Sequence, residues 1–545
     1  MVLLTPGQPP PDDYYRANFQ EVLDFVSTCY DSALQRCDRR YMAAFREVPV
    51  TAQRLLVRLF MRRGPLFRMD KLAYPEVGDT TVAVASLVDA GLLVRHPATA
   101  ADRVLGLLTR QELIQQFPFS AAQLGRAVRR GELEAAILAA NTDRRLRAQL
   151  ATYITWLELN GGRSLERLLL LCFGTTRQDL SAFVLRDLGM QRYETYPLGH
   201  AGGFADAATV DRHLAISALE DWLPRLPHIT GLHVALLGRL SQADEFRPTE
   251  RRRSRLLNEL GRWHERRGDP DRALACYGIS RRHPARERCV RLLRRRNCAG
   301  DLAAADALLE AMQAAPWCAE EQTFASRQGG KGRRQAAPAT ACLPMSDPGL
   351  EFTAGAVERM ALRELAAGGA WGIHVENALP LGLTALAYWD VLFAPVAGAF
   401  TNLMQNGPHD LFQEDFAHVR RSVIDLCRRR LRMLDDPGAL LLRRLEAKSG
   451  IACALCNWRV LSPEAVGRIV AAMPRSHLLD LVDTVIEAPY RWRTGFPDLF
   501  VVHASGGYEF IEVKGPADQL QPQQRAWFDR LHRLGLHASV RRYHA

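Results

Sequence analysis

Two apolar runs joined by a Ser-Gly-Gly turn form the segment GFPDLFVVHASGGYEFIEVKG, residues 495–515, and predict a β-hairpin. The hairpin carries charges at its open end, because Asp498 begins the first run and Glu512 and Lys514 close the second. Side chains alternate along a strand, so Glu512 and Lys514 share one face. With a turn near residues 505–507, the returning strand brings Glu512 beside Asp498 as a direct or diagonal neighbour.

The segments around the hairpin predict the rest of a small α/β domain. A helix is expected at 475–488 before the hairpin, and a helix at about 522–534 and a last strand, HASVRRY, are expected after it. Further helices are expected at 355–367, 380–394 and 414–434. The order helix, strand, strand, helix and strand is the minimal core of an α/β nuclease.

The charges of the hairpin favour a metal-dependent site over the alternative, an edge strand with surface charges. Two carboxylates held close repel each other unless a cation lies between them, and a hard divalent cation takes oxygen ligands. Lys514 would reach the same volume, where an ammonium can orient a water or stabilise charge on a phosphate. The 71 basic residues include only four lysines, Lys71, Lys331, Lys448 and Lys514. If the site is catalytic, the choice of lysine is explained, because arginine does not trade protons and only a lysine would serve here.

The N-terminal part of the chain predicts a helical DNA-binding domain. Within residues 15–95, a helix, a turn and a second helix precede a short strand, which is typical of a winged-helix DNA reader. The alternative is a small helical bundle that does not contact DNA.

The middle of the chain predicts helix pairs of the tetratricopeptide kind. Two stretches between about 250 and 315 each combine a helix, a Gly-Asp turn and an Ala-rich helix, with the turns at Gly268-Asp269 and Gly300-Asp301. The spacing of the turns is close to one such unit of roughly 34 residues. Arginine runs at 251–255 and 294–296 make this part basic, so a row of arginines could hold a phosphate backbone.

A chain of 545 residues is too long for one hydrophobic core, so several domains are expected. The boundaries follow from a Gly-, Ala- and Pro-rich linker at 326–350. We expect a DNA-binding domain at 1–150, a helical domain at 151–325 and a nuclease domain at 351–545. The predicted fold class is α+β multidomain, mostly α-helical in the N-terminal two-thirds, with winged-helix-like and tetratricopeptide-like parts and a C-terminal α/β nuclease domain.

Composition limits the partners and the compartment. The net charge of +11 and the pI near 9.3 favour an anionic partner, with nucleic acid the first candidate. There is no run of about 18 apolar residues that would predict a transmembrane helix, and the N-terminus lacks the regions of a signal peptide. Eleven cysteines without a framework spacing indicate free thiols in a reducing cytoplasm. The single CxxC, Cys453 and Cys456, lacks a matching second pair, so buried free cysteines are expected.

The hairpin and the helix after it resemble a known nuclease domain. The stretches GFPDLFVV and YEFIEVKGPADQLQPQQRAWFDRLHRLG are similar to the virus-type replication-repair nuclease (VRR-NUC) domain of the PD-(D/E)xK superfamily. The similarity is closest to the Fanconi-anaemia-associated nuclease family in its bacterial form. It extends upstream through GIHVENALPLGLTALAYWDVLF, residues 372–393, and the helical repeats.

The resemblance implies roles for particular residues of this chain. Asp498 and Glu512 would be metal ligands together with the carbonyl oxygen of Val513, and Lys514 would be the catalytic lysine. Glu376, just ahead of a predicted helix, would add a third acid, which a helix N-terminus keeps ionised. Three further residues would contact the DNA: Gln524, Arg493 and, by proximity alone, Arg491. For Arg491, a solvated surface charge is an equal alternative.

The resemblance also implies an activity. The family cleaves branched DNA, prefers 5′ flaps, has 5′-to-3′ exonuclease activity, takes part in interstrand cross-link repair and requires Mg²⁺ or Mn²⁺. A phosphodiesterase I type hydrolase of the bacterial cytosol and nucleoid is therefore expected. Eukaryotic members carry a ubiquitin-binding zinc finger, for which this chain has no suitable Cys/His set, and its N-terminal region does not obviously match a SAP module.

Two hypotheses from different classes follow. The first is a metal-dependent, structure-specific DNA endonuclease whose helical region holds branched or flapped double-stranded DNA through arginine–phosphate contacts. The second is a non-catalytic scaffold that binds DNA junctions, which the intact set of acids and lysine disfavours. A nuclease subunit of a restriction system is less favoured, because no helicase or methyltransferase motif is seen.

Overall fold

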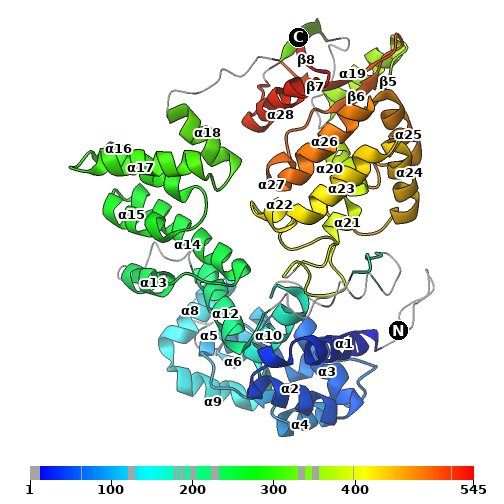
Figure 1. The fold of residues 1–545 in the computed structure, drawn as a ribbon. Helices are drawn as coiled ribbons and strands as arrows, with labels where there is room; N and C mark the ends of the chain where they lie inside the picture. The colour runs from blue at the N-terminus through cyan, green and yellow to red at the C-terminus, as the bar shows by residue number, and fades with distance from the viewer. Residues whose placement is uncertain are drawn as a thin grey trace. The chain divides into compact units, whose positions relative to one another are not determined.

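The computed structural model describes residues 13–544 apart from short segments. The segments left out are 63, 65, 119, 121–128, 177–179, 181–182, 184–185, 187–190, 197–203, 223–231, 329–337, 346–354, 397 and 517. The chain divides into two compact units, Met1–Met190 with Gly203–Val210, and Gln191–Gly202 with Asp211–Ala545 (Figure 1). Among the helices that the structure describes, none is both long enough and apolar enough to cross a bilayer.

The first unit is helical with one small sheet. Its helices are α1 (Tyr14–Cys29), α2 (Arg36–Glu47), α3 (Val50–Met61), α4 (Thr80–Asp89), α5 (Ala101–Leu105), α6 (Arg110–Gln116), α8 (Arg130–Ala140), α9 (Asp143–Tyr153) and α10 (Gly162–Phe173), with 3-10 turns η1 (Asp31–Ala33) and η2 (Met69–Lys71). The strands are β1 (Leu66–Arg68), β2 (Leu93–Arg95) and β3 (Trp156–Leu159), which pair antiparallel in the order β1-β3-β2.

The helix–turn–helix and strand expected near the N-terminus are present as α3, β1, α4 and β2. The central strand of their sheet, β3, comes from residues 156–159. The first unit therefore extends beyond the predicted boundary at residue 150. The reason is that β3 pairs with strands more than 60 residues away, and local periodicity does not reveal such a pairing.

The second unit begins with helices that stack in pairs. They are α12 (Ala207–Trp222), which starts in the first unit, α13 (Leu232–Leu240), α14 (Arg247–Arg266), α15 (Pro270–Ile279), α16 (Ala285–Arg296), α17 (Asp301–Ala314) and α18 (Ala319–Gln328). The two expected helix pairs are α14 with α15 and α16 with α17. Asp269 caps α15 by accepting from the Arg272 N–H, and Gly300 adopts a left-handed φ of 84° ahead of α17.

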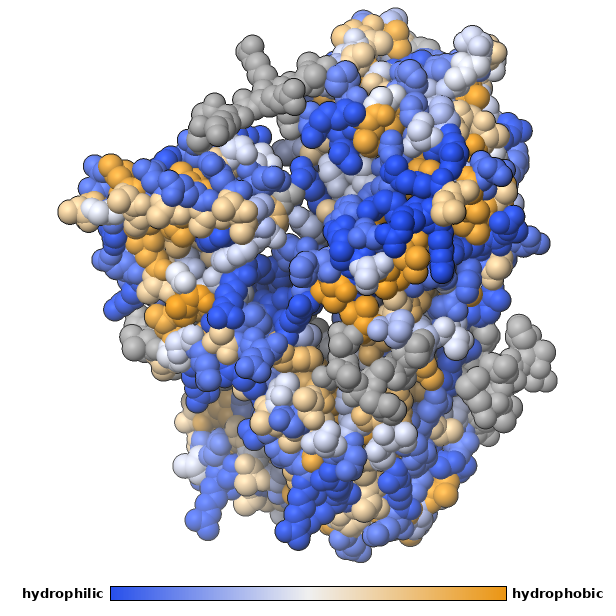
Figure 2. Space-filling view, viewed as in Figure 1, coloured by the Kyte–Doolittle hydropathy of each residue, from blue (hydrophilic) through white to orange (hydrophobic). Residues whose placement is uncertain are grey.

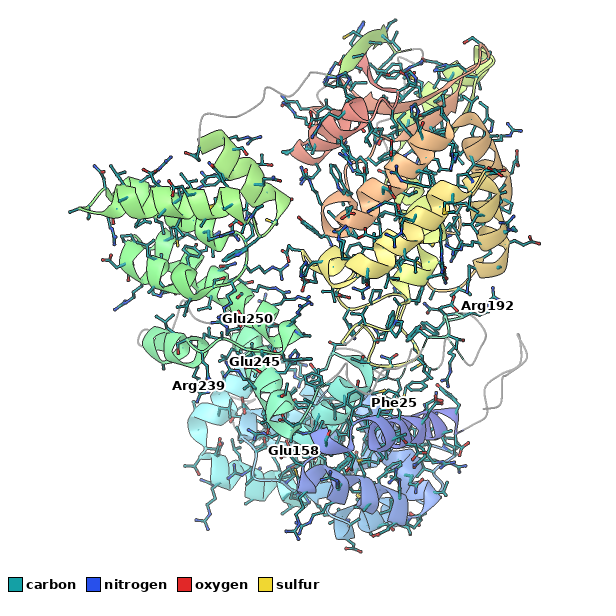
Figure 3. The ribbon with its side chains drawn as sticks, viewed as in Figure 1. Phe25, Glu158, Arg192, Arg239, Glu245 and Glu250 are labelled. Atoms are coloured by element: carbon teal, nitrogen blue, oxygen red, sulfur yellow. The ribbon has the colours of Figure 1, made fainter. Side chains whose placement is uncertain are left out.

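Several arginines of the predicted basic row are used inside the protein. Arg253 is fully buried and forms an ion pair with Glu250 at 2.7 Å; Figure 3 labels Glu250 on α14. Arg251 pairs with Asp415 at 2.7 Å, and the exposed Arg247, which lies outside the predicted row, pairs with the same carboxylate at 3.0 Å. These side chains stabilise the fold, so only part of the row is available to a phosphate backbone.

The C-terminal part holds a five-stranded sheet in the order β4-β8-β7-β6-β5. Its strands are β4 (Ala339–Pro344), β5 (Trp371–His374), β6 (Leu499–Val502), β7 (Tyr508–Lys514) and β8 (Ala538–His544). Strands β5, β6 and β7 pair antiparallel, whereas β7, β8 and β4 pair parallel. β4 lies within the predicted linker 326–350, so that part of the linker expectation is wrong. The strand is mostly exposed and has no apolar alternation, and its pairing with β8 was therefore not visible in the sequence.

Ten helices are described in this part of the chain. They are α19 (Ala356–Ala367), α20 (Ala378–Ala387), α21 (Trp389–Leu392), α22 (Phe416–Val419), α23 (Arg421–Met433), α24 (Pro437–Lys448), α25 (Pro463–Ala472), α26 (Arg475–Glu487), α27 (Pro489–Trp492) and α28 (Pro522–Arg533). Of these, α19 packs on β5 and β7, and α28 packs on β8. The helices expected at 355–367, 475–488 and 522–534 are confirmed, whereas those at 380–394 and 414–434 are each divided in two.

The alternation of the strands sends side chains into two cores. Ile511 and Val513 pack with Met360 of α19 on one face. Phe510 packs on the other face with the large core that includes Trp527 of α28. Glu512 falls between Ile511 and Val513, so its carboxylate shares the α28 face with Phe510.

An arginine-rich helix, α23, is held against α26 by ion pairs. Arg421 pairs with Glu487 at 2.8 Å, and Arg432 with Asp483 at 2.8 Å; Arg428 contacts both acids. Figure 2 shows hydrophilic side chains gathered over α22 and α23. The network anchors α26, which packs on α20 in the large core.

The CxxC pair forms a turn. The Cys456 N–H donates to the Cys453 carbonyl at 3.0 Å, and both cysteines are free thiols. Cys453 is buried as expected, while Cys456 is half-buried.

Candidate active site

The hairpin register brings the two predicted acids opposite each other. Leu499 of β6 pairs with Ile511 of β7, and the residues one step outward are Asp498 and Glu512. One carboxylate oxygen of Asp498, Oδ2, accepts from the Val513 N–H at 2.8 Å. This hydrogen bond joins Asp498 to β7 at the open end of the hairpin. The sequence predicted that Asp498 and Glu512 are neighbours, and the register confirms this, but it did not predict the hydrogen bond.

Glu512 is almost fully buried, at 1% exposure, and only one of its oxygens is satisfied. Its Oε1 lies 2.7 Å from the Lys514 Nζ and accepts from the Gln524 Nε2 at 2.5 Å. Its Oε2 is buried and has no hydrogen-bond partner among the residues that the structure describes. A buried carboxylate oxygen without a partner is costly, so this atom is poised to bind a cation or a donor that enters the site.

Helix α28 fixes the position of Gln524. Its Oε1 accepts from the Gln521 N–H at 2.9 Å as part of a capping box, which leaves the Nε2 directed at Glu512. Gln524, predicted from the resemblance to contact DNA, lies in the site and contacts Glu512 directly.

The two carboxyls are hard to ionise where they lie. Burial raises the pKa of Asp498 to about 6, and the charge of Glu358 on α19 adds to the effect, against the Val513 N–H and Lys514, which lower it. Burial and the charge of Asp498 raise the pKa of Glu512 to about 7, opposed by Lys514. A bound cation favours the ionised forms and would lower both pKa values.

The chain turns sharply after β5 and brings a third acid to the site. Glu376 adopts a left-handed φ of 39°, and the Val375 and Glu376 N–H groups donate to the Asp498 carbonyl at 2.8 and 3.1 Å. Asn377, which precedes α20, accepts through its Oδ1 from the Phe496 N–H at 3.1 Å. A non-glycine residue in this conformation is strained, and such strain is typical of functional sites.

His374, the last residue of β5, lies close to Glu376 and Asp498. The ligand atoms of His374, Glu376 and Asp498 all lie within 4.8 Å of one another. Neither His374 nor Glu358 was predicted from the sequence as part of the site. The signal for His374 is the stretch GIHVEN, where a histidine stands two residues before the predicted acid; Glu358, on α19, carries no such signal.

The two predicted arginines lie just before β6 and stack on rings. Arg491 lies over the Trp492 ring at 4.8 Å, and the exposed Arg493 lies over the Phe412 ring at 5.5 Å. Among the described residues, neither arginine forms an ion pair with a carboxylate, so both charges are available to a phosphate.

Gly495 controls how closely α28 approaches the strand end. Its φ is 90°, and a Cβ there would lie 2.8 Å from the Gln523 backbone and 2.9 Å from the Gln524 nitrogen. Gly495→Ala is expected to lower the free energy of unfolding by about 2–4 kcal/mol, because the backbone of α28 must move. Urea unfolding followed by tryptophan fluorescence measures this effect.

The control for that change is Gly506→Ala in the hairpin turn. Gly506 has a similar φ of 87°, but a Cβ there would meet nothing within 4 Å. It is expected to cost only about 1 kcal/mol, from backbone strain alone. Equal losses for the two variants would show that the contact with α28 does not matter.

The donor set fits a divalent cation. Carboxylates of Asp498, Glu512 and Glu376 supply the oxygen ligands that such ions prefer, and the buried Oε2 of Glu512 is an oxygen in need of a partner. Lys514 is 8% exposed and already contacts Glu512, so an ammonium lies beside the acids. The arrangement suits hydrolysis of a phosphate ester.

Two family models match the chain. The model described as "FAN1, HTH domain" matches residues 13–94, and the model described as "VRR-NUC domain" matches residues 435–544. The second range contains Asp498, Glu512, Lys514 and Gln524 but not Glu376.

The chain is similar over nearly its whole length to named proteins. It is 33% identical to the Fanconi-associated nuclease 1 homolog of Pseudomonas aeruginosa, across 96% of this chain and 94% of that protein. It is 26% identical to the Arabidopsis thaliana homolog, across 95% of this chain and 65% of that protein.

The fold is similar to solved structures as well. It matches the crystal structure of paFAN1 bound to 2nt 5′flap DNA with gap, with a TM-score of 0.86 and 31% identity, across 99% of this chain and 100% of that chain. The complex of paFAN1 with 1nt 5′flap DNA with gap matches with a TM-score of 0.83 and 30% identity, across 98% and 100% of the two chains.

Proposed function

This chain belongs to the Fanconi-associated nuclease 1 family and is a DNA-hydrolysing nuclease, and we propose that it is a structure-specific endonuclease that cuts 5′-flap DNA. Its VRR-NUC domain implies dependence on a divalent metal, for which we propose Mg²⁺ or Mn²⁺. The observation that carries the proposal is the buried, unpartnered Oε2 of Glu512, on a carboxylate that faces Asp498 and contacts Lys514.

In this proposal the metal ligands are Asp498, Glu512, Glu376 and the carbonyl oxygen of Val513. A bound ion supplies Lewis-acid stabilisation of the charge that develops on the phosphate and the leaving oxygen. Lys514 and Gln524 hold Oε1 of Glu512, so that Oε2 is left for the ion. These separate roles of the two oxygens are supported by the structure, in which Oε1 accepts hydrogen bonds and Oε2 has no partner among the described residues.

Lys514 has a second role in the hydrolysis. Its ammonium donates to the attacking water or to a phosphate oxygen, which orients the water and offsets negative charge in the transition state. The P–O bond to the leaving strand breaks as the bond from water to phosphorus forms, the attacking water releases a proton to the solvent, and the leaving oxygen takes up a proton. Because Lys514 is buried, its charge acts in a poorly screened environment.

DNA is held by groups around this centre. Arg493 and Arg491 bind phosphates near the scissile bond. Their positions before β6 support this role, as does the absence of any ion pair from either guanidinium group among the described residues. The helix–turn–helix part and the exposed arginines of the helix pairs bind the duplex arms through phosphates without reading base sequence. Two of the similar structures hold 5′-flap DNA, which supports flapped DNA as the substrate.

The finer activities rest on family membership. We propose 5′-to-3′ exonuclease activity at the same centre and a role in interstrand cross-link repair. The second candidate, a scaffold that binds junctions without cutting, is disfavoured because a scaffold has no need for a buried, half-satisfied glutamate beside a lysine.

A panel of 5′-flap, 3′-flap, nicked and intact duplexes tests the proposal. With Mn²⁺ we expect the 5′ flap to be cut at least about tenfold faster than the other substrates, because only its junction presents the scissile phosphate at the site. EDTA is expected to stop cutting while DNA binding persists. Binding of the 5′ flap without any cleavage in Mn²⁺ would favour the scaffold instead.

A further inference from the structure

His374 lies at the edge of the proposed metal site without a structural task. Among the described residues, no hydrogen bond or ion pair engages its ring, and the side chain is exposed. Strand pairing explains its place, because His374 pairs with Leu499, the residue after Asp498. A histidine with a free ring beside two carboxylates is available to a ligand.

The geometry brings three ligand atoms of two kinds together. One nitrogen of His374 and one oxygen each of Glu376 and Asp498 lie within 4.8 Å of one another, a separation that one ion can span. A second observation at the same centre points to a cation, since the Oε2 of Glu512 is buried and unpartnered. The held backbone of Glu376 keeps its carboxylate at this edge.

The donor set decides which ion fits best. Mg²⁺ takes oxygen ligands almost entirely, whereas Mn²⁺ and the later divalent transition metals accept imidazole nitrogen as well as carboxylate oxygen. We propose that His374 is a direct nitrogen ligand of the ion held by Glu376 and Asp498, and that it makes the site prefer Mn²⁺ over Mg²⁺. This inference rests on the proposed function of the same site and adds the residue that determines its metal preference.

The experiment detects the ligands of the bound metal and does not depend on nuclease activity. Full-length protein loaded with Mn²⁺ is studied by pulsed electron paramagnetic resonance, which detects a directly bound nitrogen through its modulation of the electron spin echo. Nitrogen modulation is expected in the native protein and is expected to be lost in His374→Ala. His503→Ala is the matched control, because His503 lies in the same sheet domain but pairs with Glu509 at 3.2 Å in the hairpin turn.

Calorimetric titration gives a second measurement. In His374→Ala the affinity for Mn²⁺ is expected to fall about tenfold or more, while that for Mg²⁺ changes less than about twofold. Circular dichroism checks that the variant keeps its fold, as is expected for a substitution at an exposed side chain.

Different results would contradict the role of His374 and the proposed nuclease function. Mn²⁺ bound by the native protein without nitrogen modulation, or equal losses of both ions in His374→Ala, overturns the role of His374 and leaves the nuclease proposal standing. Native protein that binds neither ion overturns both.

Discussion

Asp498→Asn is expected to lower the rate of 5′-flap cleavage at least about a thousandfold, whereas the affinity for the flap is expected to change less than about twofold. The amide keeps the shape of the side chain, and its oxygen can still accept from the Val513 N–H at the hairpin end. It removes the negative charge that an ion needs. Single-turnover cleavage and fluorescence anisotropy measure the two quantities.

The stability of Asp498→Asn shows whether a loss of cleavage comes from lost catalysis or from unfolding. The folded-state pKa of Asp498 is raised from 3.8 to about 6, so ionisation costs stability as the pH rises through that window, and the full cost is present at pH 7. Asp498→Asn removes this cost, and the metal-free variant is expected to be at least as stable as the native protein. Asp529→Asn, which removes an acid on α28 that pairs with Arg533, is the control and should cut normally. Substantial cleavage by Asp498→Asn would end the nuclease mechanism.

Lys514→Met is expected to reduce cleavage about a hundred- to a thousandfold with flap binding retained. The ammonium touches Glu512 at 2.7 Å, and its loss removes both a donor at the phosphate and the charge that opposes the raised pKa of Glu512. The cleavage rate of Lys514→Arg is expected to fall by a similar factor, because the planar guanidinium does not place a point charge in this buried space. Rates are measured at saturating Mn²⁺.

Lys448→Met is the matched control for the lysine. Lys448 also forms a partly buried pair, with Glu194 at 2.5 Å, and lies over the Trp389 ring. Its loss should lower stability without lowering the rate of the folded protein. Cleavage by Lys514→Met within about fivefold of the native rate would contradict the proposed role of this lysine.

Much of the centre was readable from a few residues in sequence. Glu512 and Lys514 lie on β7 and Asp498 directly precedes β6, and a turn near residues 505–507 makes Asp498 and Glu512 direct or diagonal neighbours. Helix α28 was predicted within one residue of its observed end because Pro522 and the apolar period mark it. The position of Glu376 came from family resemblance, not from such local patterns.

Other parts of the site depend on contacts between distant segments. Glu376 and His374 reach Asp498 through a strand pairing that spans more than 100 residues, and Gln524 reaches Glu512 because α28 packs back on β7. Register across such distances is set by the packing of whole layers, which local periodicity does not encode. The same reason hid β3 in the first unit and β4 in the predicted linker.

From its own pattern the amino-acid sequence determined a β-hairpin with two neighbouring acids and a nearby lysine. Only the tertiary structure decided that the Glu512 carboxylate is buried, with one oxygen unpartnered among the described residues. It also decided that His374 lies beside Glu376 and Asp498. Strand alternation and turn formation depend on a few neighbouring residues, so a short stretch of sequence is enough to predict them. Burial and ligand geometry result from the packing of α19, α20 and α28 around the sheet, and no short stretch of sequence contains them.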